Sequence, residues 1–327
     1  MTLVFILLCA VIVDFLYGEP PSKYHPVVYM GKYIKAFWAK RPSGRERHLL
    51  YFGGALVVSG ALLFSWPLRL LGMFPDVVMV IPAIPLLKTA FSLSGLLRAG
   101  EDVLAALKKG NLPQARKSLS WNLVSRDTSD LSDEEVTGAA VESMAENLTD
   151  SLASPLFFFG LFGLPGAFFY RFCNTCDSMI GYRAGDMEWG GKAAARLDDI
   201  LNWIPARMTA FLLLAAGAMA GENIMAGAEA LRTQRKNTPS PNAGWTMSVM
   251  AGMLGVTLEK RDTYILSGGN EPITAEVLRR CLKIVRIAAG LILTRGGDPR
   301  RSSWDVPLGL NSGPIRSPPT GGWNTDG

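Results

Sequence analysis

Long apolar runs alternate with polar segments along most of this chain. The runs lie at about 2–17, 51–72, 77–92, 152–170, 204–222 and 284–294. A helix that crosses a membrane needs about 20 predominantly apolar residues, and the second, fourth and fifth runs come near that length. The pattern therefore predicts an all-α, polytopic integral membrane protein with helical loops in the cytoplasm.

The third run is expected to form a kinked helix. Pro82 and Pro85 each remove a backbone donor from it. Lys88 lies near the end of this run. We expect its ammonium group to extend towards the water interface, as lysines at helix ends often do.

The fourth run, 152–170, is interrupted by Gly163 and Pro165. Such a break is typical of a kinked span or of a re-entrant hairpin buried in protein. If the run spans the membrane, the polar segment 171–203 lies on the far side. If it folds back, that segment returns beside the acidic residues that precede the run. The hydropathy of the run favours the first alternative. The second is favoured because it would let the polar residues of 171–203 act together with the acidic residues before the run. Both alternatives therefore stay open.

Composition supports a membrane protein and excludes some other classes. The chain is 49% hydrophobic and 19% charged, with a mean hydropathy of +0.20. Its net charge is +5, and basic residues crowd the segment 23–47, which is expected to face the cytoplasm and anionic lipid. Nucleic-acid binding is not expected, because no recognition motif is present. The four cysteines include one isolated C-x-x-C pair, Cys173 and Cys176, and are expected to be free thiols.

The chain is expected to hold one membrane-embedded catalytic domain, 1–294. Within it, 96–120 has the spacing of two helices joined by a turn at Gly110 and Asn111. The segment 295–327 is rich in glycine, proline, serine and arginine, and is expected to be a disordered tail.

Acidic residues follow one face of a helix predicted over 132–150. Ser132 and Glu135 form a capping box at its start. Glu142, Glu146 and Asp150 follow Glu135 at spacings that fall within a sector of about 80°. A solvated face would explain Glu135. It explains Glu146 and Asp150 poorly, because carboxylates next to an apolar run repel one another. Bound Mg²⁺ would turn that repulsion into coordination.

Two further polar groups flank the fourth and fifth runs. Asn174 and Asp177 follow the fourth run, while Asp198 and Asn202 share a helix face before the fifth. All four side chains carry oxygen atoms that suit a divalent cation. Each group alone is a weak signal, and an interfacial helix start is the structural alternative.

The remaining candidates lie near predicted helix starts. Ser240 is a candidate N-cap residue with Pro241 after it, and a helix N-terminus also binds anions. A plain cap is the favoured interpretation there. His25, after the first run, suits an acid/base role or a phosphate contact, and a structural turn explains it equally well.

In this order the segments resemble the adenosylcobinamide-phosphate synthase family of cobalamin biosynthesis. The resemblance covers about Asp14 to Leu293, with Ser125 and Cys176 as departures from the family pattern. Its motifs are D-x-x-x-G-E-P, H-P-V-x-x-M-G, S-R-D-T, E-S-M-A-E-N-L-x-D, N-T-x-D-S-M-x-G-Y-R, A-R-L-D-D-x-L-N-W-I-P-A-R and S-P-N-A-G-W.

The resemblance implies a multi-pass enzyme of the cell membrane. It would join the carboxyl group of adenosylcobyric acid, a corrinoid, to aminopropanol phosphate or a related amino alcohol phosphate, with ATP and Mg²⁺. Contacts with the lipid bilayer and with other membrane enzymes of cobalamin assembly are expected. No P-loop or dinucleotide fingerprint occurs, so the site of ATP is not indicated. A transporter or a non-catalytic sensor on a related scaffold is the alternative.

The residues and the resemblance together give three sets of candidates. The candidate catalytic residues are His25, Arg126, Asp127, Glu142, Glu146, Arg196 and Arg207. The candidate substrate-binding residues are Asp14, Asn174, Arg183, Asn202, Ser240, Asn242 and Gly244. The candidate Mg²⁺ ligands are Glu146, Asp150, Asp177, Asp198 and Asp199.

Overall fold

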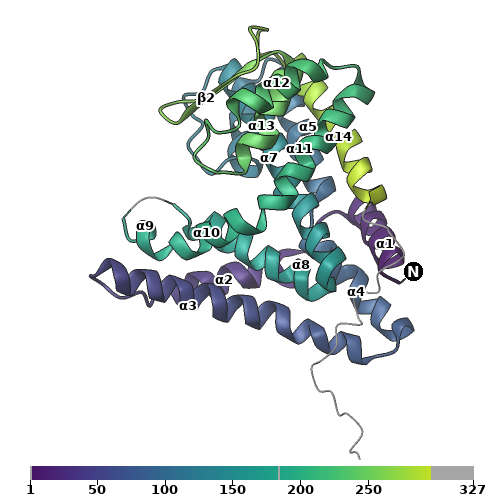
Figure 1. The fold of residues 1–327 in the computed structure, drawn as a ribbon, viewed down its shortest axis with the longest axis vertical. Coiled ribbons are helices and arrows are strands. Elements are labelled where there is room, and N and C mark those ends of the chain that lie inside the picture. Colours follow the sequence, from purple (N-terminus) through teal and green to yellow (C-terminus); the bar gives the residue numbers. More distant parts are fainter. Residues whose placement is uncertain (1, 183–184, 296–327) are drawn as a thin grey trace, which may run out of the picture.

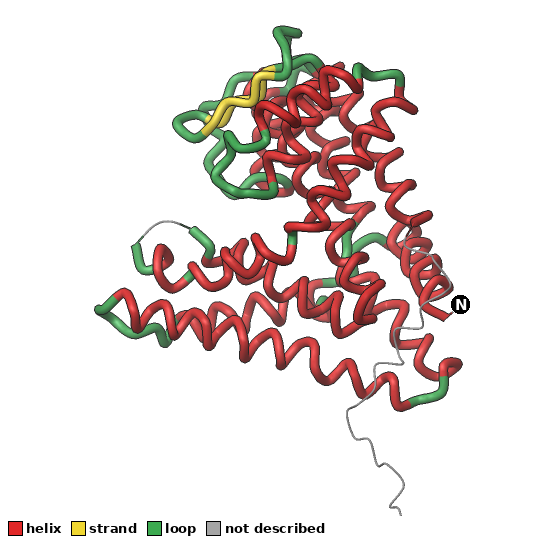
Figure 2. Tube along the Cα trace, in the orientation of Figure 1, coloured by secondary structure: helices red, strands yellow, loops and turns green. Residues whose placement is uncertain are grey.

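The computed structural model describes residues 2–182 and 185–295, and almost all of its elements are helices (Figures 1 and 2). The α-helices are α1 (Thr2–Tyr17), α2 (Pro26–Trp38), α3 (Glu46–Ser65), α4 (Asp76–Ala90), α5 (Leu93–Lys108), α6 (Leu112–Asn122), α7 (Asp133–Leu148), α8 (Ser154–Ile180), α9 (Met187–Gly190), α10 (Lys192–Leu201), α11 (Trp203–Ala220), α12 (Ile224–Gln234), α13 (Ala243–Leu254) and α14 (Ala275–Arg295). Two 3₁₀ helices, η1 (Ser22–Tyr24) and η2 (Trp66–Met73), and a π-helical turn, η3 (Thr149–Ala153), join them. The predicted tail after residue 295 lies outside the described residues.

The helices form two groups that share one hydrophobic core. Figure 1 shows α2, α3, α8 and α10 in the lower group, where α8 packs against α3, α10 and α2. The upper group contains α5, α7 and α11 to α14, with α13 packed against α12, α11 and α7. The long helical path from α7 through η3 into α8 connects the two groups.

Four helical stretches are long and apolar enough to cross a membrane, and α1 is a shorter apolar helix. The four are Glu46–Met73, Val77–Lys108, Asp133–Ile180 and Trp203–Ala220. Large apolar side chains on α1 and α3 are exposed, among them Phe5, Leu8, Ile12, Leu62 and Leu63. A soluble monomer does not tolerate apolar surface of this extent, so the chain is a polytopic membrane protein, as predicted.

The last apolar run, 284–294, is one of six that could enter the bilayer but is short for a span, and the structure places it in the core. It belongs to α14, which is not among the four candidate spans. Ile284, Val285 and Ala288 of this helix are buried in the core. An apolar run of this length is more typical of a buried core helix than of a span.

The break in the fourth run reverses the chain. Gly163 has φ 65° and ψ −155°, a backbone conformation that is essentially restricted to glycine. On either side of it, the rings of Phe158 and Tyr170 stack with their centroids 5.4 Å apart. In a straight helix, two residues with this separation in sequence would lie about 18 Å apart. The fold-back alternative is therefore the one observed, and it brings the Tyr170 hydroxyl to 3.5 Å from the Asp150 carboxylate in η3.

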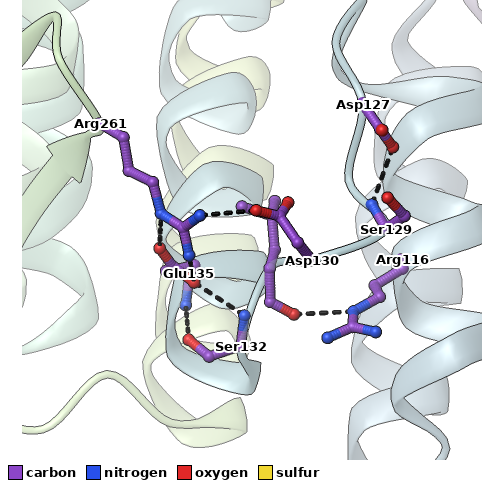
Figure 3. Close-up of polar contacts among 8 residues, drawn as sticks. Arg116, Asp127, Ser129, Asp130, Ser132, Glu135 and Arg261 are labelled. Atoms are coloured by element: carbon purple, nitrogen blue, oxygen red, sulfur yellow. Dashed lines mark hydrogen bonds and ion pairs between the residues drawn. The ribbon is translucent and has the colours of Figure 1, made fainter.

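The predicted caps and turns of the polar segments are also present. The Ser132 hydroxyl accepts from the backbone of Glu135, and the Glu135 carboxylate accepts from the backbone of Ser132, as in a capping box (Figure 3). The helix pair predicted over 96–120 appears as α5 and α6, with Gly110 in a left-handed conformation and Asn111 capping α6.

One element has no counterpart in the predicted fold. Strands β1 (Thr257–Lys260) and β2 (Tyr264–Ser267) form an antiparallel hairpin. Arg261 in its turn binds Glu135 and also donates to Asp130 at 2.7 Å, which ties the hairpin to the start of α7 (Figure 3). The hairpin is thereby held against α7.

Lys88 was expected to reach the interface, but the structure shows it buried. Its side chain is 3% exposed, and its Nζ lies 3.0 Å from Asp14 Oδ1 and 2.8 Å from Glu19 Oε1. The backbone of Ser94 donates to Asp14 at 2.7 Å. Burial alone would raise the pKa of Glu19, but hydrogen bonds from His25, Lys88 and a serine lower it to about 2. A buried ion network therefore fixes the ends of α1 and α4.

Replacing Gly163 with alanine should destabilise the fold-back. A side chain in this backbone conformation costs about 1–3 kcal/mol. Gly160→Ala is the matched control, because a Cβ at position 160 meets no atom. Thermal unfolding in detergent micelles should show a clearly lower midpoint for Gly163→Ala only. Equal midpoints for the two variants would contradict the assigned conformation.

Replacing Lys88 with methionine should destabilise the protein strongly, because it leaves Asp14 charged and buried without its cation. Breaking a buried ion pair in this way costs about 3–5 kcal/mol. The double variant Lys88→Met with Asp14→Asn removes the uncompensated charge and should recover much of the loss. Denaturation midpoints in micelles measure both effects, and a single variant as stable as the parent would refute the network.

Candidate active site

A cavity of about 210 Å³ lies where the two groups of helices meet, between η3, α8, α10 and the segment before α13. All five candidate Mg²⁺ ligands line it, together with several predicted substrate-binding residues. Its polar lining consists of Glu146, Thr149, Asp150, Asp177, Asp198, Asp199, Asn202, Ser240, Asn242 and Thr246. The structure therefore brings together side chains from four separate segments of the sequence.

Local departures from regular helix bring the acidic groups together. The helix predicted through Asp150 is α-helical only to Leu148 and continues as the π turn η3. Such turns are rare and frequently mark functional sites. The reversal at Gly163 then returns Asn174 and Asp177 to the same place.

Asp198 is held by two amide groups. Asn174 donates to its Oδ1 at 3.1 Å, and Asn202 donates to its Oδ2 at 2.9 Å. Asn202 in turn accepts from Ser154 at 2.5 Å and from Tyr170 at 3.0 Å. Burial raises the pKa of Asp198 to about 6 although the two amides oppose it. Asn174 and Asn202, expected to bind substrate, thus orient a carboxylate.

The cavity concentrates negative charge. Asp150 interacts repulsively with Asp198, Glu146 and Asp177. No lysine or arginine is among the described residues that line the cavity. The hydroxyl of Thr149, also in the lining, is buried without a hydrogen-bond partner in the described chain. A cation would offset the repulsion and give the hydroxyl a polar neighbour.

The carboxylates and hydroxyl groups of the cavity are oxygen donors, the kind of ligand that Mg²⁺ takes. No group of three or more His, Cys, Asp or Glu side chains in 2–182 and 185–295 is arranged to hold an ion. Mg²⁺ is usually bound by one or two carboxylates, several waters and substrate phosphates. Glu146, in the last turn of α7, and Asp150, in the π turn, both line the cavity and can supply these carboxylates.

Glu142 lies one helical turn before Glu146 and outside the cavity lining. It is buried, at 6% exposure, and its Oε1 has no hydrogen-bond partner among the described residues. Tyr264 of the hairpin and the positive charge of Arg126 lie beside it, and Lys260 interacts with both Glu142 and Glu146. Burial and the Glu142 carboxylate raise the pKa of Tyr264, so its hydroxyl keeps its proton. Sequence reasoning missed Lys260 and Tyr264, because nothing in the sequence pointed to a hairpin.

Several candidates lie elsewhere. Asp14 and His25 belong to the ion network at Lys88, and neither lines the cavity. Asp127 accepts from the backbone of Ser129 at 2.9 Å within a turn, which lowers its pKa (Figure 3). Asp127 does not line the cavity either.

Other candidates lie around the cavity in roles that differ from those expected. Arg196 is largely exposed and lies 3.9 Å from Asp199, the spacing of a surface pair. Gly244 allows close packing, because a Cβ there would overlap the backbone carbonyl of Arg235. Arg183 lies outside the described residues.

The cap before α13 differs from the predicted one. The helix begins at Ala243 with Asn242 in the flanking position. Ser240 was expected to be the N-cap residue. Its hydroxyl accepts instead from the backbone of Asn242 at 3.2 Å and of Ala243 at 3.4 Å, which fixes the preceding turn.

The chain is similar to proteins of cobalamin biosynthesis. It is 41% identical over 284 residues to a probable cobalamin biosynthesis protein CobD of Methanothermobacter thermautotrophicus, covering 87% of this chain and 93% of that protein. A cobalamin biosynthesis protein CobD of Dehalococcoides mccartyi is 40% identical over 294 residues, 88% of this chain and 94% of that protein. A probable CobD of Pyrococcus furiosus is 38% identical over 279 residues, 84% and 91% of the two chains.

No solved structure matches the chain. The model of the family described as CobD/Cbib protein matches residues 7–288, which include every element from α1 to most of α14 and all the residues of the cavity. This chain is a member of the CobD/Cbib family of cobalamin biosynthesis proteins.

Proposed function

We propose that this protein is an ATP- and Mg²⁺-dependent ligase of the cell membrane. It joins the carboxyl group of adenosylcobyric acid to the amino group of aminopropanol phosphate, or of a related amino alcohol phosphate, through an amide. The observation that carries the proposal is the carboxylate-lined cavity built around the π turn in a chain of this family. Its donor chemistry suits Mg²⁺ together with phosphate-bearing substrates.

The reaction needs an activated carboxyl group, because a free carboxylate is a poor electrophile. Its oxygen attacks the γ-phosphorus of ATP, the bond to the β-phosphate oxygen breaks, and ADP leaves. The amine nitrogen then attacks the carbonyl carbon of this acyl phosphate. The carbon–oxygen bond breaks, inorganic phosphate leaves, and one proton is lost from the nitrogen. The site must therefore stabilise phosphate charge and accept a proton.

Glu146 and Asp150 would hold the metal, and Asp177, Asp198 and Asp199 line the same cavity. Bound Mg²⁺ would neutralise phosphate oxygens and withdraw charge from the transferred group. Asn174 and Asn202 keep the Asp198 carboxylate fixed in the cavity. Fixed groups of this kind lose little free energy to reorganisation during the reaction.

A carboxylate of the cavity is better placed than His25 to accept the amine proton. The Nδ1 of His25 accepts from the backbone of Val27 at 3.2 Å, and its Nε2 lies 3.0 Å from Glu19. Both ring nitrogens are therefore engaged in structure. The carboxylates of the cavity lie instead beside the place where the substrates would meet.

The direct test is incubation of detergent-purified protein with adenosylcobyric acid, aminopropanol phosphate, ATP and Mg²⁺. Formation of the amide together with ADP and phosphate would support the proposal. If no amide forms with any amino alcohol phosphate while the protein is folded, the proposal is wrong. Transport of a corrinoid without amide formation would identify the transporter alternative.

The variants Glu146→Gln and Asp150→Asn should lose most of their activity. Each keeps the shape of the side chain and removes one charged ligand. Loss of one electrostatic contact to the reacting groups typically lowers the rate about 10²–10³-fold. Glu229→Gln is a suitable control, because Glu229 forms an exposed pair with Arg232. Activity should be measured across a range of Mg²⁺ concentrations at equal membrane abundance.

Excess Mg²⁺ should restore part of the activity of both variants, since a weakened site can still be filled. Activity within about threefold of the parent at limiting Mg²⁺, a difference below about 1 kcal/mol, would show that these residues are not the metal site. Asp177, Asp198 and Asp199 would then be the next ligands to test.

A further inference from the structure

A ladder of two arginines and two tryptophans lies at the rim of the carboxylate cavity. The Arg207 guanidinium on α11 lies 4.2 Å from the ring centre of Trp203 and 4.5 Å from that of Trp245. The Arg235 guanidinium, at the end of α12, lies 5.4 Å from the same Trp245 ring. Trp203, Arg207, Trp245 and Arg235 are called the rim ladder below. It joins three helices around two positive charges.

The two charges have no acidic partner in the described part of the chain. Arg207 donates to the backbone carbonyl of Trp203 at 2.6 Å and to Asn242 Oδ1 at 3.2 Å. Arg235 donates only to backbone carbonyls, those of Leu231 at 3.2 Å and Arg232 at 2.9 Å. All these acceptors are neutral, and the two guanidinium groups repel each other. An anion between them would relieve that repulsion.

Three other arginines of the protein, Arg232, Arg261 and Arg280, are paired with carboxylates. Arg232, one turn before Arg235, donates twice to the Glu229 carboxylate, at 2.9 and 2.6 Å. Arg280 and Arg261 are likewise bound to carboxylates. The rim ladder departs from this pattern because aromatic rings hold its guanidinium groups. Aromatic stacking leaves the charge and part of the N–H edge of an arginine available.

Asn242 connects the rim ladder to the cavity. Its Oδ1 accepts from Arg207, and its Nδ2 donates to the backbone carbonyl of Asp199 at 2.7 Å. Both Asn242 and Asp199 line the cavity. A ligand that extends from the carboxylates of the cavity past Asn242 would therefore reach the guanidinium group of Arg207.

Membrane anchoring explains only part of this arrangement. Tryptophan and arginine often lie at the interface end of a span, and Trp203, 54% exposed at the start of α11, fits that role. Trp245 and Arg235 lie on α13 and α12, which are not among the four candidate spans. Trp245 is also partly buried in the core. Anchoring therefore does not account for the second ring or the second charge.

We propose that Arg207 and Arg235, positioned by Trp203 and Trp245, bind the phosphate groups of a substrate at the rim of the cavity. Guanidinium groups match phosphate oxygens with paired hydrogen bonds. The phosphate comes from one of two sources, the polyphosphate of ATP or the amino alcohol phosphate. The inference deepens the proposed function and rests on it for the identity of these ligands.

Equilibrium binding to detergent-purified, full-length protein tests the rim ladder without turnover. The probes are an ATP analogue with a non-hydrolysable β–γ bridge, aminopropanol phosphate and inorganic tripolyphosphate, each without corrinoid. The variants are Arg207→Gln and Arg235→Gln, and Arg232→Gln is the control from the same helix. Loss of a charge-assisted contact should raise the Kd about tenfold or more.

The pattern across probes identifies the source of the phosphate. A raised Kd for the nucleotide analogue and tripolyphosphate assigns the rim ladder to ATP, and a raised Kd for aminopropanol phosphate alone assigns it to the amino alcohol. The control should stay within twofold of the parent. Higher salt should reduce the difference in Kd between parent and variants, because screening weakens in the parent the contact that the variants lack.

An unchanged Kd for all three probes in both variants would overturn the inference, including the case in which their thermal stability falls. Arg235→Gln carries the test if Arg207→Gln does not fold, because Arg235 bonds only to backbone carbonyls near its own helix end. Arginine-dependent binding without amide formation would leave the rim ladder established and the proposed ligase activity refuted. Amide formation with normal binding by both variants would support the ligase activity and refute the phosphate-binding role of the rim ladder.

Discussion

The reversal of the chain at Gly163 is the constraint on which the cavity depends. Residues on the two sides of it belong to one apolar stretch that composition alone treats as a single span. Because the chain folds back, Tyr170 reaches Asn202, and Asn174 reaches Asp198. A straight helix would carry these side chains away from Glu146 and Asp150. The chemistry of the cavity thus follows from one backbone conformation that glycine alone adopts easily.

The protein has two buried clusters of charged residues, one around Lys88 and one in the cavity, and their charges are paired in different ways. At the ends of α1 and α4, Lys88 is shared by two carboxylates, so that cluster is complete by itself. In the cavity, Asp150 lies among other carboxylates and Asp198 is held by neutral amides. The cations that act on these carboxylates, Lys260 on Glu146 and Arg196 on Asp199, lie outside the lining, as do the guanidinium groups of the rim ladder. The first arrangement holds helices together. The second leaves carboxylates close to one another, which supports the proposed binding of a metal and a phosphate-bearing substrate there.

The helices and the acidic face of α7 could be predicted from the sequence. The way in which distant polar segments come together in space could not. The capping box at Ser132 and the turn at Gly110 depend on local hydrogen bonds, so their residues could be recognised directly. The π turn leaves no comparable signature, because it depends on packing around Asp150 rather than on residue type. The same holds for the hairpin that brings Tyr264 to Glu142. Lys88 was misjudged because its partner, Asp14, is remote in sequence.

The π turn also sets the phase between α7 and α8. One extra residue in a turn rotates everything after it by about 100° relative to a regular α-helix. Ser154, the first residue after η3, therefore points where an uninterrupted helix would not place it, and η3 divides the helical path into two segments with different faces. The backbone of Ser92 donates to the carbonyl of Ser151 at 3.0 Å, so the junction between α4 and α5 holds the turn from outside. A deletion of one residue here would keep the helix and the composition, yet it would turn the Ser154 hydroxyl away from Asn202, to which it donates at 2.5 Å.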